Sequence, residues 1–405
     1  MSGMRPLGKL ISLEEALSIC DKVSKPMERK ERVPIWSALD RVLAEDIRAG
    51  ISVPSFTRSA MDGFAVRAID VKRANKKEPV VLRIIDKVFA GDVATKPITS
   101  GQCVEIATGG MLPKGADSVI MVEATRRESA KRVAVIAPVS RGEHVISPGD
   151  DIKEGAIVAR KGELLTPAKI GSIAAIGVDG IIAYERPNVI VMPTGDEVIR
   201  PGEKLKPGQV YDVNTFTLKS AVQSFGGAVD VRLIVDDSKE SLLEAIESEA
   251  GADIIIFSGG SSVGEKDLIV DAVSDLGDVL FHGVAIRPGK PTLLGKVGKS
   301  IVLGMPGHPT SCLSNAYIFL EPMITKIGRI PERQKRVRKS RIASDVRVSP
   351  DRTTILTVKV DGDRAVPAFK ESSAITSMAN ADGYIIIPPG EKMLRKGSAV
   401  EVREF

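Results

Sequence analysis

The chain opens with apolar residues at helical spacing. They recur at intervals of three or four positions from Leu13 to Cys20, and Ser12 with Glu15 forms a capping box in front of them. The serine side chain can satisfy a backbone N–H group that the first helical turn leaves unpaired. The pattern predicts an opening helix that ends near Pro26.

Short β-type runs separated by glycine, proline and aspartate replace this pattern between about 51 and 151, and they predict a mostly β domain. A helical pattern then returns. Thr166 offers an N-cap, Pro167 a first helical residue and Gly177 a stop. We expect this second helix to pack beside the opening helix and so to close a discontinuous first domain around the inserted β domain.

Strands and helices alternate from Tyr184 onward. The apolar runs are nearly continuous, which is typical of strands buried on both faces of a parallel sheet. We therefore predict a doubly wound α/β domain whose helices cover both faces. The expected strands are 188–192, 229–235, 253–257 and 300–305, and the expected helices cover about 214–225, 238–250, 267–276 and 309–327.

The end of the chain is first strongly basic and then β-rich. The basic stretch 326–341 contains no aromatic side chain that could stack on bases, so we interpret it as a solvated linker rather than a nucleic-acid interface. The residues after it show short strand patterns and predict a small β barrel.

Composition narrows the class of protein. Of the 405 residues, 43% are apolar and 27% are charged, which is ordinary for a globular protein. No apolar run approaches the ~20 residues of a membrane span. The first residues lack the apolar core of a secretory signal, so we expect a cytoplasmic protein without a membrane contact. A net charge of +5 favours anionic ligands but is too small to indicate nucleic-acid binding.

Cysteine and histidine are too scattered in the sequence to predict a metal centre. Cys20, Cys103 and Cys312 lie far apart, which excludes a disulfide framework, and the histidines show no zinc spacing. We expect the thiols to be reduced and mostly buried.

The most informative pattern follows the predicted strands. Parallel strands end at one edge of a sheet, and open α/β sheets bind ligands in the crevice beyond that edge. The residues that follow each strand are thus expected to lie together. They are Thr194, Gly195, Asp196 and Glu197 after the first strand, Asp236 and Asp237 after the second, the loop from Ser258 to Asp267 after the third, and Pro306, Gly307, His308 and Pro309 after the fourth.

Each of these groups has an ordinary explanation on its own, as a helix cap or a turn. Together they place glycines, helix N-termini and carboxylates at one edge. Glycines and helix N-termini favour phosphate, and several carboxylates would repel phosphate unless a divalent cation, most plausibly Mg²⁺, lies between them. The pattern predicts a Mg²⁺-assisted site for a phosphorylated small molecule. No Walker A lysine follows, and the glycine spacing fits the dinucleotide fingerprint poorly.

A second loop also suits an anion, because Arg287 and Lys290 flank Pro288 and Gly289. Surface lysine and arginine are usually only solvated. Beside an acid-rich strand edge, however, fixed positive charges on a stiff turn are better explained by an anionic group.

Seven stretches together resemble the molybdopterin molybdenumtransferases, the family of bacterial MoeA and the gephyrin E domain. The resemblance covers nearly the whole chain in the expected order and is least distinct in the terminal barrel. The stretches are PSFTRSAMDGFAVRA at 54–68, EIATGGMLPKGADSVIMVE at 105–123, GDDIKEG at 149–155, PTGDEV at 193–198, SGGSSVGEKD at 258–267, RPGKP at 287–291 and MPGHPTS at 305–311.

The resemblance implies four domains: a linking domain of 1–50 plus 152–183, an inserted β domain of 51–151, a molybdopterin-binding α/β domain of 184–328 and a β barrel of 329–405. It also implies a homodimer with an active site shared between subunits, and docking of the molybdopterin adenylyltransferase. The implied reaction inserts molybdate or tungstate into adenylylated molybdopterin and releases AMP with the help of Mg²⁺, late in molybdenum cofactor biosynthesis.

The resemblance also assigns residues to this reaction. Those implied in catalysis are Asp62, Thr108, Glu197, Asp237 and Asp267, and those implied in holding Mg²⁺ are Asp196, Glu197, Asp236 and Asp267. Those implied in binding the substrates are Thr194, Gly195, Ser258, Gly259, Gly260, Ser261, Gly264, Arg287, Pro288, Lys290, Pro306, His308, Pro309, Arg352 and Ser372. Asp151 matches a further position of the inserted region. On sequence alone, a tight Asp-Gly turn explains Asp62 as well as a direct contact does.

Two positions depart from the family pattern. Gly283 stands where many members have lysine, and His308 stands in place of asparagine. We hypothesise that His308 or Arg287 takes over part of the oxyanion contact. Two other functions stay open. A Mg²⁺-dependent nucleotide-pyrophosphate hydrolase would not need the SAMDG region or the barrel, and a non-catalytic scaffold would not need acids at the strand ends.

Overall fold

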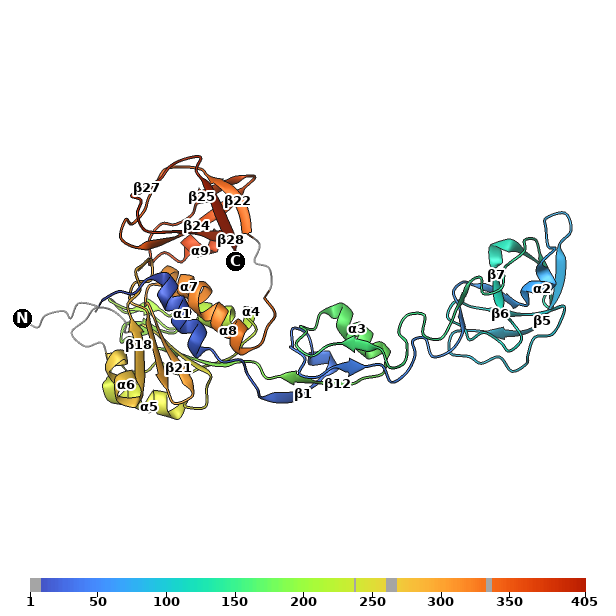
Figure 1. The fold of residues 1–405 in the computed structure, drawn as a ribbon, viewed down its shortest axis with the longest axis horizontal. Coiled ribbons are helices and arrows are strands. Elements are labelled where there is room, and N and C mark those ends of the chain that lie inside the picture. The colour runs from blue at the N-terminus through green and yellow to red at the C-terminus, as the bar shows by residue number, and fades with distance from the viewer. Residues whose placement is uncertain (1–8, 237, 260–267, 333–336) are drawn as a thin grey trace, which may run out of the picture.

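The computed structural model describes residues 9–236, 238–259, 268–332 and 337–405. An α/β domain and a β barrel occupy one end of a long molecule, a small unit lies in the middle, and a β domain forms the other end (Figure 1). Within the described ranges, no helix is both long and apolar enough to cross a membrane.

The opening helix α1 (Leu13–Val23) forms as predicted, with the Ser12 side chain accepting a hydrogen bond from the backbone N–H of Glu15 at 3.1 Å. The expected packing partner was wrong. The apolar stripe of α1 joins the core of the α/β domain, where Leu13 and Cys20 are buried in one cluster with Ile324 of helix α8 (Glu321–Ile327). A large neighbouring core buries more apolar surface than the short second helix could, which explains the difference.

The middle unit is built where the chain passes outward and returns. Strand β1 (Lys30–Pro34) pairs antiparallel with β12 (Gly180–Tyr184), and β2 (Ile47–Arg48) pairs with β11 (Ile157–Ala159). The predicted second helix is α3 (Pro167–Ala175), capped by Thr166. Its apolar face is covered within this unit by Leu43, Leu165 and Ile181.

The inserted region is mostly β, as predicted. Its six-stranded sheet has the order β7-β4-β6-β5-β9-β8, and the short helix α2 (Ala68–Val71) lies beside it. Apolar side chains form a separate buried cluster on each face of the sheet. The strands are β4 (Gly63–Val66), β5 (Val80–Val88), β6 (Gln102–Ile106), β7 (Ser118–Met121), β8 (Thr125–Ser129) and β9 (Arg132–Val135), and β3 (Arg58–Ser59) pairs separately with β10 (Val145–Ile146).

The α/β domain contains a six-stranded sheet of order β16-β13-β17-β21-β20-β18. Its first four strands are the predicted ones and are parallel, as expected. Strands β20 and β18, which the sequence did not predict, extend the sheet with antiparallel pairs. The strands are β13 (Asn188–Pro193), β16 (Ala228–Val231), β17 (Ile254–Ser258), β18 (Asp278–His282), β20 (Leu293–Val297) and β21 (Ser300–Met305).

Helices cover both faces of this sheet because side chains alternate along its central strands. Val189 and Val191 of β13 face the cluster that includes α1 and α8, whereas Ile190 and Met192 face the cluster below α5 and α6. The predicted helices are α4 (Asn214–Ser224), α5 (Lys239–Ser248), α6 (Leu268–Leu276) and α7 (Pro309–Asn315), which continues through a π-helical segment (Ala316–Leu320) into α8.

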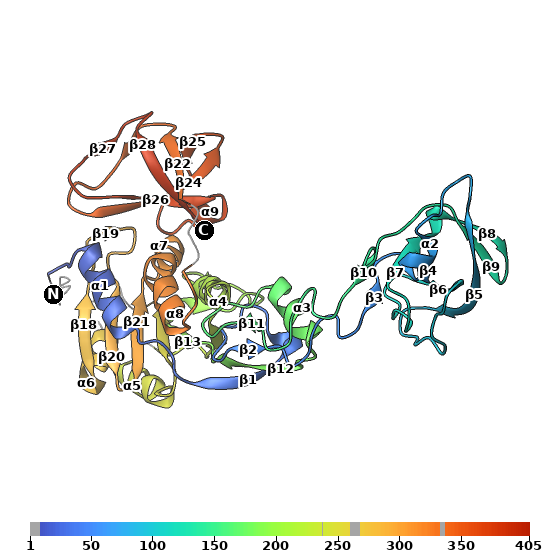
Figure 2. The ribbon, with the colours of Figure 1, turned by 45° about the vertical axis from the view of Figure 1, so that its right-hand side comes forward.

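The C-terminal strands form a closed five-stranded barrel, which confirms the predicted barrel. The ring closes because β24 pairs with both β25 and β26. Strand β19 (Ile286–Arg287) from the α/β domain pairs with β24, so the barrel is joined to that domain by backbone hydrogen bonds (Figure 2). The barrel strands are β22 (Val337–Ile342), β24 (Thr353–Asp361), β25 (Arg364–Pro367), β26 (Gly383–Ile387) and β28 (Ala399–Glu404).

The three thiols behave as expected. Cys20, Cys103 and Cys312 are free and buried. Burial raises the pKa of the Cys20 and Cys103 thiols to about 12, so they stay protonated at neutral pH.

Candidate functional site

The carboxyl ends of three neighbouring strands bring the predicted strand-end residues together. Pro193 at the end of β13 pairs with Ser258 at the end of β17, and Ser258 pairs with Met305 at the end of β21. The backbone N–H of Thr194 donates to the carbonyl of Ser258 at 3.2 Å, and that of Gly259 donates to the carbonyl of Met305 at 3.4 Å. The stretches PTGDEV, SGG and MPGHP therefore meet at one edge.

Several polar atoms at or near this edge are buried without a partner. Thr194 and Ser258 are only 1% and 4% exposed, yet their hydroxyl oxygens have no hydrogen-bond partner among the described residues. Leaving such groups unpaired is costly, so they mark a place for water or a polar ligand.

Sequence reasoning missed two further residues of this kind. Asn214 and Thr215, at the start of α4, also carry side-chain oxygens that are buried and unpaired within the described structure. The amide of Asn214 donates to the carbonyl of Gly307 at 2.8 Å, which ties α4 to the MPGHP stretch. The signal in the sequence was two polar residues at the start of the predicted helix 214–225, and only the fold shows that this start is buried.

Glycine is required where the strand ends approach each other. Gly195 and Gly259 have φ values of +122° and +117°. A Cβ atom on Gly259 would lie 2.3 Å from the carbonyl oxygen of Thr194, which no side chain can tolerate without movement of the backbone. Because Gly195 and Gly259 carry no side chains, a ligand can approach the backbone at this edge directly.

The structure describes only some of the predicted acids. Asp196 and Glu197 are exposed directly after Gly195, and Asp236 follows Val235, which forms a parallel bridge with Thr194. Asp237, Gly260, Ser261, Gly264 and Asp267 lie outside the described residues.

The fit to Mg²⁺ can be judged for the described acids. Carboxylate oxygens are the ligand type that Mg²⁺ prefers. In the part of the chain that the structure describes, however, no three acids, histidines or cysteines are grouped as a metal site. Asp196, Glu197 and Asp236 are thus not gathered into such a group, and Asp267, the fourth residue of the predicted set, lies outside the described residues.

The turn with Arg287 and Lys290 is held by a buried amide that sequence reasoning also missed. Asn315 is fully buried on α7, and its Nδ2 donates to the hydroxyl of Thr292 at 2.6 Å and to the carbonyl of Gly289 at 3.4 Å. The hydroxyl of Thr292 donates to the same carbonyl at 2.7 Å. Asn315 is thus a positioning residue for this turn.

The barrel supplies the remaining predicted residues. The hydroxyl of Ser372 lies 2.9 Å from Nδ1 of His308, and the backbone N–H of Thr310 donates to the carbonyl of Ser372 at 3.0 Å. Pro309 is the first residue of α7, and buried Pro306 ends the MPG turn before it. Arg352 precedes Thr353, whose N–H donates to the carbonyl of Ala285 beside β19 at 2.9 Å.

A second group of predicted residues meets in the β domain. Both the backbone N–H and the hydroxyl of Thr108 donate to Oδ1 of Asp62, at 2.7 and 2.9 Å. These hydrogen bonds, the backbone one first, lower the pKa of the Asp62 carboxyl. The N–H of Asp151 donates to the carbonyl of Val53 at 3.0 Å, which places Asp151 beside the segment that leads into β3. A tight Asp-Gly turn alone does not account for Asp62, whose carboxylate is oriented by a distant segment.

The two groups of residues are far apart within one chain. The strand ends of β13, β17 and β21 lie in the α/β domain, and the middle unit separates them from the β domain with β3, β4 and β10 in both views (Figures 1 and 2). One chain therefore does not assemble all the predicted residues into one site.

We expect the substitution Thr108→Val to raise the pKa of Asp62 while leaving it below its ordinary value. The substitution removes the hydroxyl donor, but the backbone donor of residue 108 remains. Because the folded-state pKa is lowered, the stabilising contribution of Asp62 is present above its unfolded-state pKa and is lost as pH falls through the folded value. Carboxyl-carbon NMR titration measures the shift.

Thr95→Val is the matched control for this titration. Thr95 donates its N–H and hydroxyl to Asp86, whose pKa is lowered first by that N–H group. The control should raise the pKa of Asp86 and leave Asp62 unchanged. An Asp62 pKa that does not respond to Thr108→Val would contradict the assigned pair.

Comparison with known proteins agrees with this geometry. The chain matches "MoeA N-terminal region (domain I and II)" over residues 11–177, "Probable molybdopterin binding domain" over 190–326 and "MoeA C-terminal region (domain IV)" over 339–405. It is 34% identical over 320 residues to a protein of Haemophilus influenzae named molybdopterin molybdenumtransferase, with 78% of each chain covered.

A Bacillus subtilis protein of the same name is 31% identical, with 92% of this chain and 89% of that protein covered. A crystal structure described as a molybdopterin biosynthesis MoeA protein from Pyrococcus horikosii is 37% identical, superposes with a TM-score of 0.81, and covers 98% of this chain and 99% of its own. The similarity thus extends over all parts of the fold.

Proposed function

Because this chain belongs to the MoeA family, we propose that it is a molybdopterin molybdenumtransferase, an enzyme of molybdenum cofactor biosynthesis. The proposed reaction inserts molybdate or tungstate into the dithiolene of adenylylated molybdopterin and releases AMP. The observation that carries the proposal is the strand edge, where unpaired buried hydroxyls of Thr194 and Ser258 meet a backbone that only glycine permits.

The strand edge has the groups needed to hold a phosphorylated substrate. The unpaired hydroxyls of Thr194 and Ser258, at the ends of β13 and β17, suit phosphate oxygens, and the closeness of Gly259 to Thr194 keeps side chains out of their way. We assign Thr194, Gly195, Ser258 and Gly259 to this role, with Gly260, Ser261 and Gly264 continuing the loop.

A second set of groups suits the oxometalate. Arg287 and Lys290 flank the turn that Asn315 holds, and Arg352, Ser372 and His308 come from the barrel contact beside it. These side chains offer cationic and hydroxyl donors, which an oxyanion requires, although Arg352 also forms an ion pair with Asp351 at 3.6 Å. Pro288, Pro306 and Pro309 shape the two turns.

Magnesium completes the proposal. When bound, Mg²⁺ would offset the negative charge that develops on the departing phosphate. We assign its binding to Asp196, Glu197, Asp236 and Asp267, and catalytic roles to Glu197, Asp237 and Asp267. The described acids are the right ligand type, and completion of the set by residues 237 and 267 is part of the proposal.

The separation of the two residue groups supports a shared active site. We propose a homodimer in which Asp62, Thr108 and Asp151 of one subunit face the strand edge of the other. We propose the four domains with the boundaries expected from sequence, with α1 packing against the α/β domain. We also propose a cytoplasmic location and docking of the molybdopterin adenylyltransferase, which would deliver the substrate to the strand edge.

AMP release from adenylylated molybdopterin tests the function. Purified protein with Mg²⁺ should release AMP in the presence of molybdate or tungstate, and the two arms show which oxyanion is preferred. Asp267→Asn should lose this activity and keep the folded circular-dichroism spectrum. Binding of the substrate by the wild-type protein without AMP release would replace the enzyme by a scaffold, and release of AMP without any oxyanion dependence would favour a hydrolase.

A separate experiment tests the assignment of the oxyanion-binding residues. His308→Ala and Arg287→Ala should each raise the molybdate concentration needed for half-maximal activity, by about tenfold for the loss of one charge-assisted contact. Exposed Lys299, in the turn between β20 and β21 at the other end of the sheet, provides the control Lys299→Ala. Unchanged molybdate dependence in both site variants would remove these residues from the proposal.

A further inference from the structure

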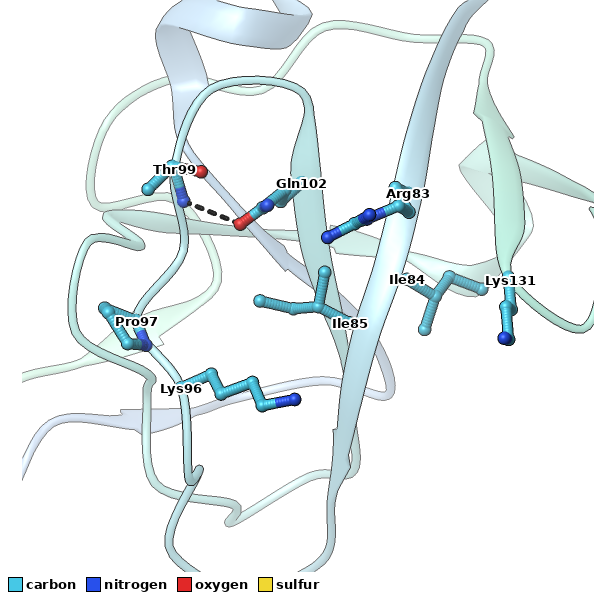
Figure 3. Close-up of a pocket in the computed structure, with 8 residues that line it drawn as sticks. All are labelled: Arg83, Ile84, Ile85, Lys96, Pro97, Thr99, Gln102 and Lys131. Atoms are coloured by element: carbon cyan, nitrogen blue, oxygen red, sulfur yellow. Dashed lines mark hydrogen bonds between the residues drawn. The ribbon is translucent and has the colours of Figure 1, made fainter.

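The β domain contains a pocket that the proposed reaction does not use. It lies between strand β5 and the loop that leads into β6, and its volume is about 440 Å³ (Figure 3). A volume of this size is typical of small-molecule sites. The residues that matter for its chemistry are Arg83, Ile85, Lys96, Thr99, Gln102 and Lys131.

Three cationic side chains from three segments line this pocket. Arg83 comes from β5, Lys96 from the following loop and Lys131 from the turn between β8 and β9. The side chains of Arg83 and Lys96 converge over Ile85, and Lys131 lies beyond Ile84 (Figure 3). No aspartate or glutamate is among the lining residues. Like charges placed around one space repel each other unless an anion lies between them.

These cations differ from their neighbours on the same sheet. Lys87 and Arg127 both form ion pairs with Glu105, at 3.0 and 2.7 Å. Within the described part of the chain, Arg83, Lys96 and Lys131 form no side-chain hydrogen bond or ion pair at all. The sheet thus balances some of its cations internally and leaves those at the pocket to an external partner.

The acid nearest in sequence to the pocket is already engaged. One oxygen of Asp86 accepts hydrogen bonds from the N–H and the hydroxyl of Thr95, at 3.1 and 3.0 Å, and the other accepts from the N–H of Lys87 at 2.8 Å. The positive charge of Lys96 makes a small contribution to lowering the pKa of Asp86, but the two side chains form no ion pair. Its carboxylate therefore pins the loop, is not among the lining residues, and offsets only part of the charge of Lys96.

The neutral polar groups of the pocket are also donors. The side-chain oxygen of Gln102 accepts the N–H of Thr99 at 3.1 Å, which leaves the amide NH₂ group of Gln102 to donate elsewhere (Figure 3). The hydroxyl of Thr99 adds another donor. Cations and donors surround an apolar floor that includes Ile85 and Pro97.

The loop that carries these groups is firmly held. The oxygens of Asp70 accept the hydroxyl of Ser100 at 3.1 Å and the N–H of Gly101 at 3.0 Å. Ile98 is 4% exposed, and its N–H donates to the carbonyl of Lys114 at 2.8 Å. The pocket is therefore formed before any ligand arrives, which reduces the entropy lost on binding.

We propose that this pocket binds a small oxyanion with two or more negative charges, of the phosphate-ester or polyphosphate class. Guanidinium and ammonium groups with neutral donors match phosphate oxygens, and the apolar floor can take the organic part of an ester. An ordinary patch of solvated lysines would not require a pinned loop, a concave shape and the exclusion of acids together.

The pocket is separate from the Asp62–Thr108 pair. Arg83 pairs with Gln102 at the first residue of β6, whereas Thr108 follows the last residue of that strand. Six residues of extended chain span about 20 Å, so the two features lie at opposite ends of β6. Binding here therefore gives the β domain an anion site that is separate from the Asp62–Thr108 pair.

Calorimetry with pyrophosphate tests the proposal on the full-length protein. We expect a binding event that weakens as salt is raised, because exposed charges are screened. Hydrogen exchange should slow in residues 95–103 when pyrophosphate is present. The double variant Arg83→Ala/Lys96→Ala should weaken this event by at least tenfold and abolish the local protection.

A matched control removes the same charge elsewhere. Lys76 and Lys77 are exposed in the turn before β5, so Lys76→Ala/Lys77→Ala loses two charges without touching the pocket. It should bind pyrophosphate as the wild type does. The proposal is overturned if pyrophosphate gives no protection of residues 95–103, if binding survives the pocket variant, or if an Asp/Glu-rich peptide binds there and pyrophosphate does not.

Discussion

Heterodimers of an Asp62→Ala chain and an Asp267→Asn chain should regain AMP release that neither variant shows as a homodimer. In the proposed dimer, the intact β domain of the Asp267→Asn chain faces the intact strand edge of the Asp62→Ala chain. One of the two sites is then complete, so activity should reach about half of the wild-type value. Co-expression with two different tags and sequential purification isolates the heterodimer for the assay.

The control for this experiment combines two chains that each carry a substitution in the β domain. A heterodimer of Asp62→Ala and Asp151→Ala chains has a damaged β domain at each site, so it should stay as inactive as its parents. If the first heterodimer also stays inactive, the site is not shared in the proposed way. Such a result would leave the long separation seen in Figures 1 and 2 without a functional explanation.

Gly259→Ala should abolish AMP release and destabilise the α/β domain. The new Cβ would lie 2.3 Å from the carbonyl oxygen of Thr194, and the backbone at residue 259 has a φ of +117°. Overpacking and a positive φ for a non-glycine residue together cost about 2–5 kcal/mol. A displacement of about 1 Å at the strand edge is enough to reduce activity by about a hundredfold or more. Thermal unfolding and the AMP assay measure both effects.

Gly298→Ala is the control, because it introduces a positive φ for a non-glycine residue at a position away from the candidate site. Gly298 lies in the turn between β20 and β21, has a φ of +57°, and has no atom within 4 Å of a Cβ built on it. This control should lose about 1–2 kcal/mol of stability, the cost of the positive φ alone, and retain full activity. If Gly259→Ala behaved in the same way, the close approach of the strand ends would have no role in the reaction.

The fold was predictable where local chemistry decides it. Ser12 and Thr166 cap helices at the positions expected from their sequence signatures, and the alternating apolar faces of β13 predict helices on both sides of its sheet. The packing partners of helices and the directions of strands were harder to predict from the sequence. The stripe of α1 is compatible with any apolar partner, and a helical pattern does not say which one buries it. The reversed direction of β20 depends on its short connection to β21 rather than on strand composition.

The candidate site shows the same division. Glycine and acid positions after strands could be predicted, because parallel strands end at a common edge. Asn214 and Asn315 could not, because a polar residue inside a helical pattern reads as solvent-exposed until its burial is known. Asp196 and Glu197 lie at the strand edge, as the sequence predicts, and both are exposed. Their assignment as metal ligands stays a prediction.

The outward and returning segments β1 and β12 have a mechanical consequence. Because they are paired residue by residue, from Lys30 with Tyr184 to Pro34 with Gly180, neither can change length without the other. A small tilt at the base of this double connection moves the distant carboxylate of Asp62 through a much larger arc. In the proposed dimer, the reach of one subunit toward the other thus depends on the stiffness of a two-stranded arm far from any substrate.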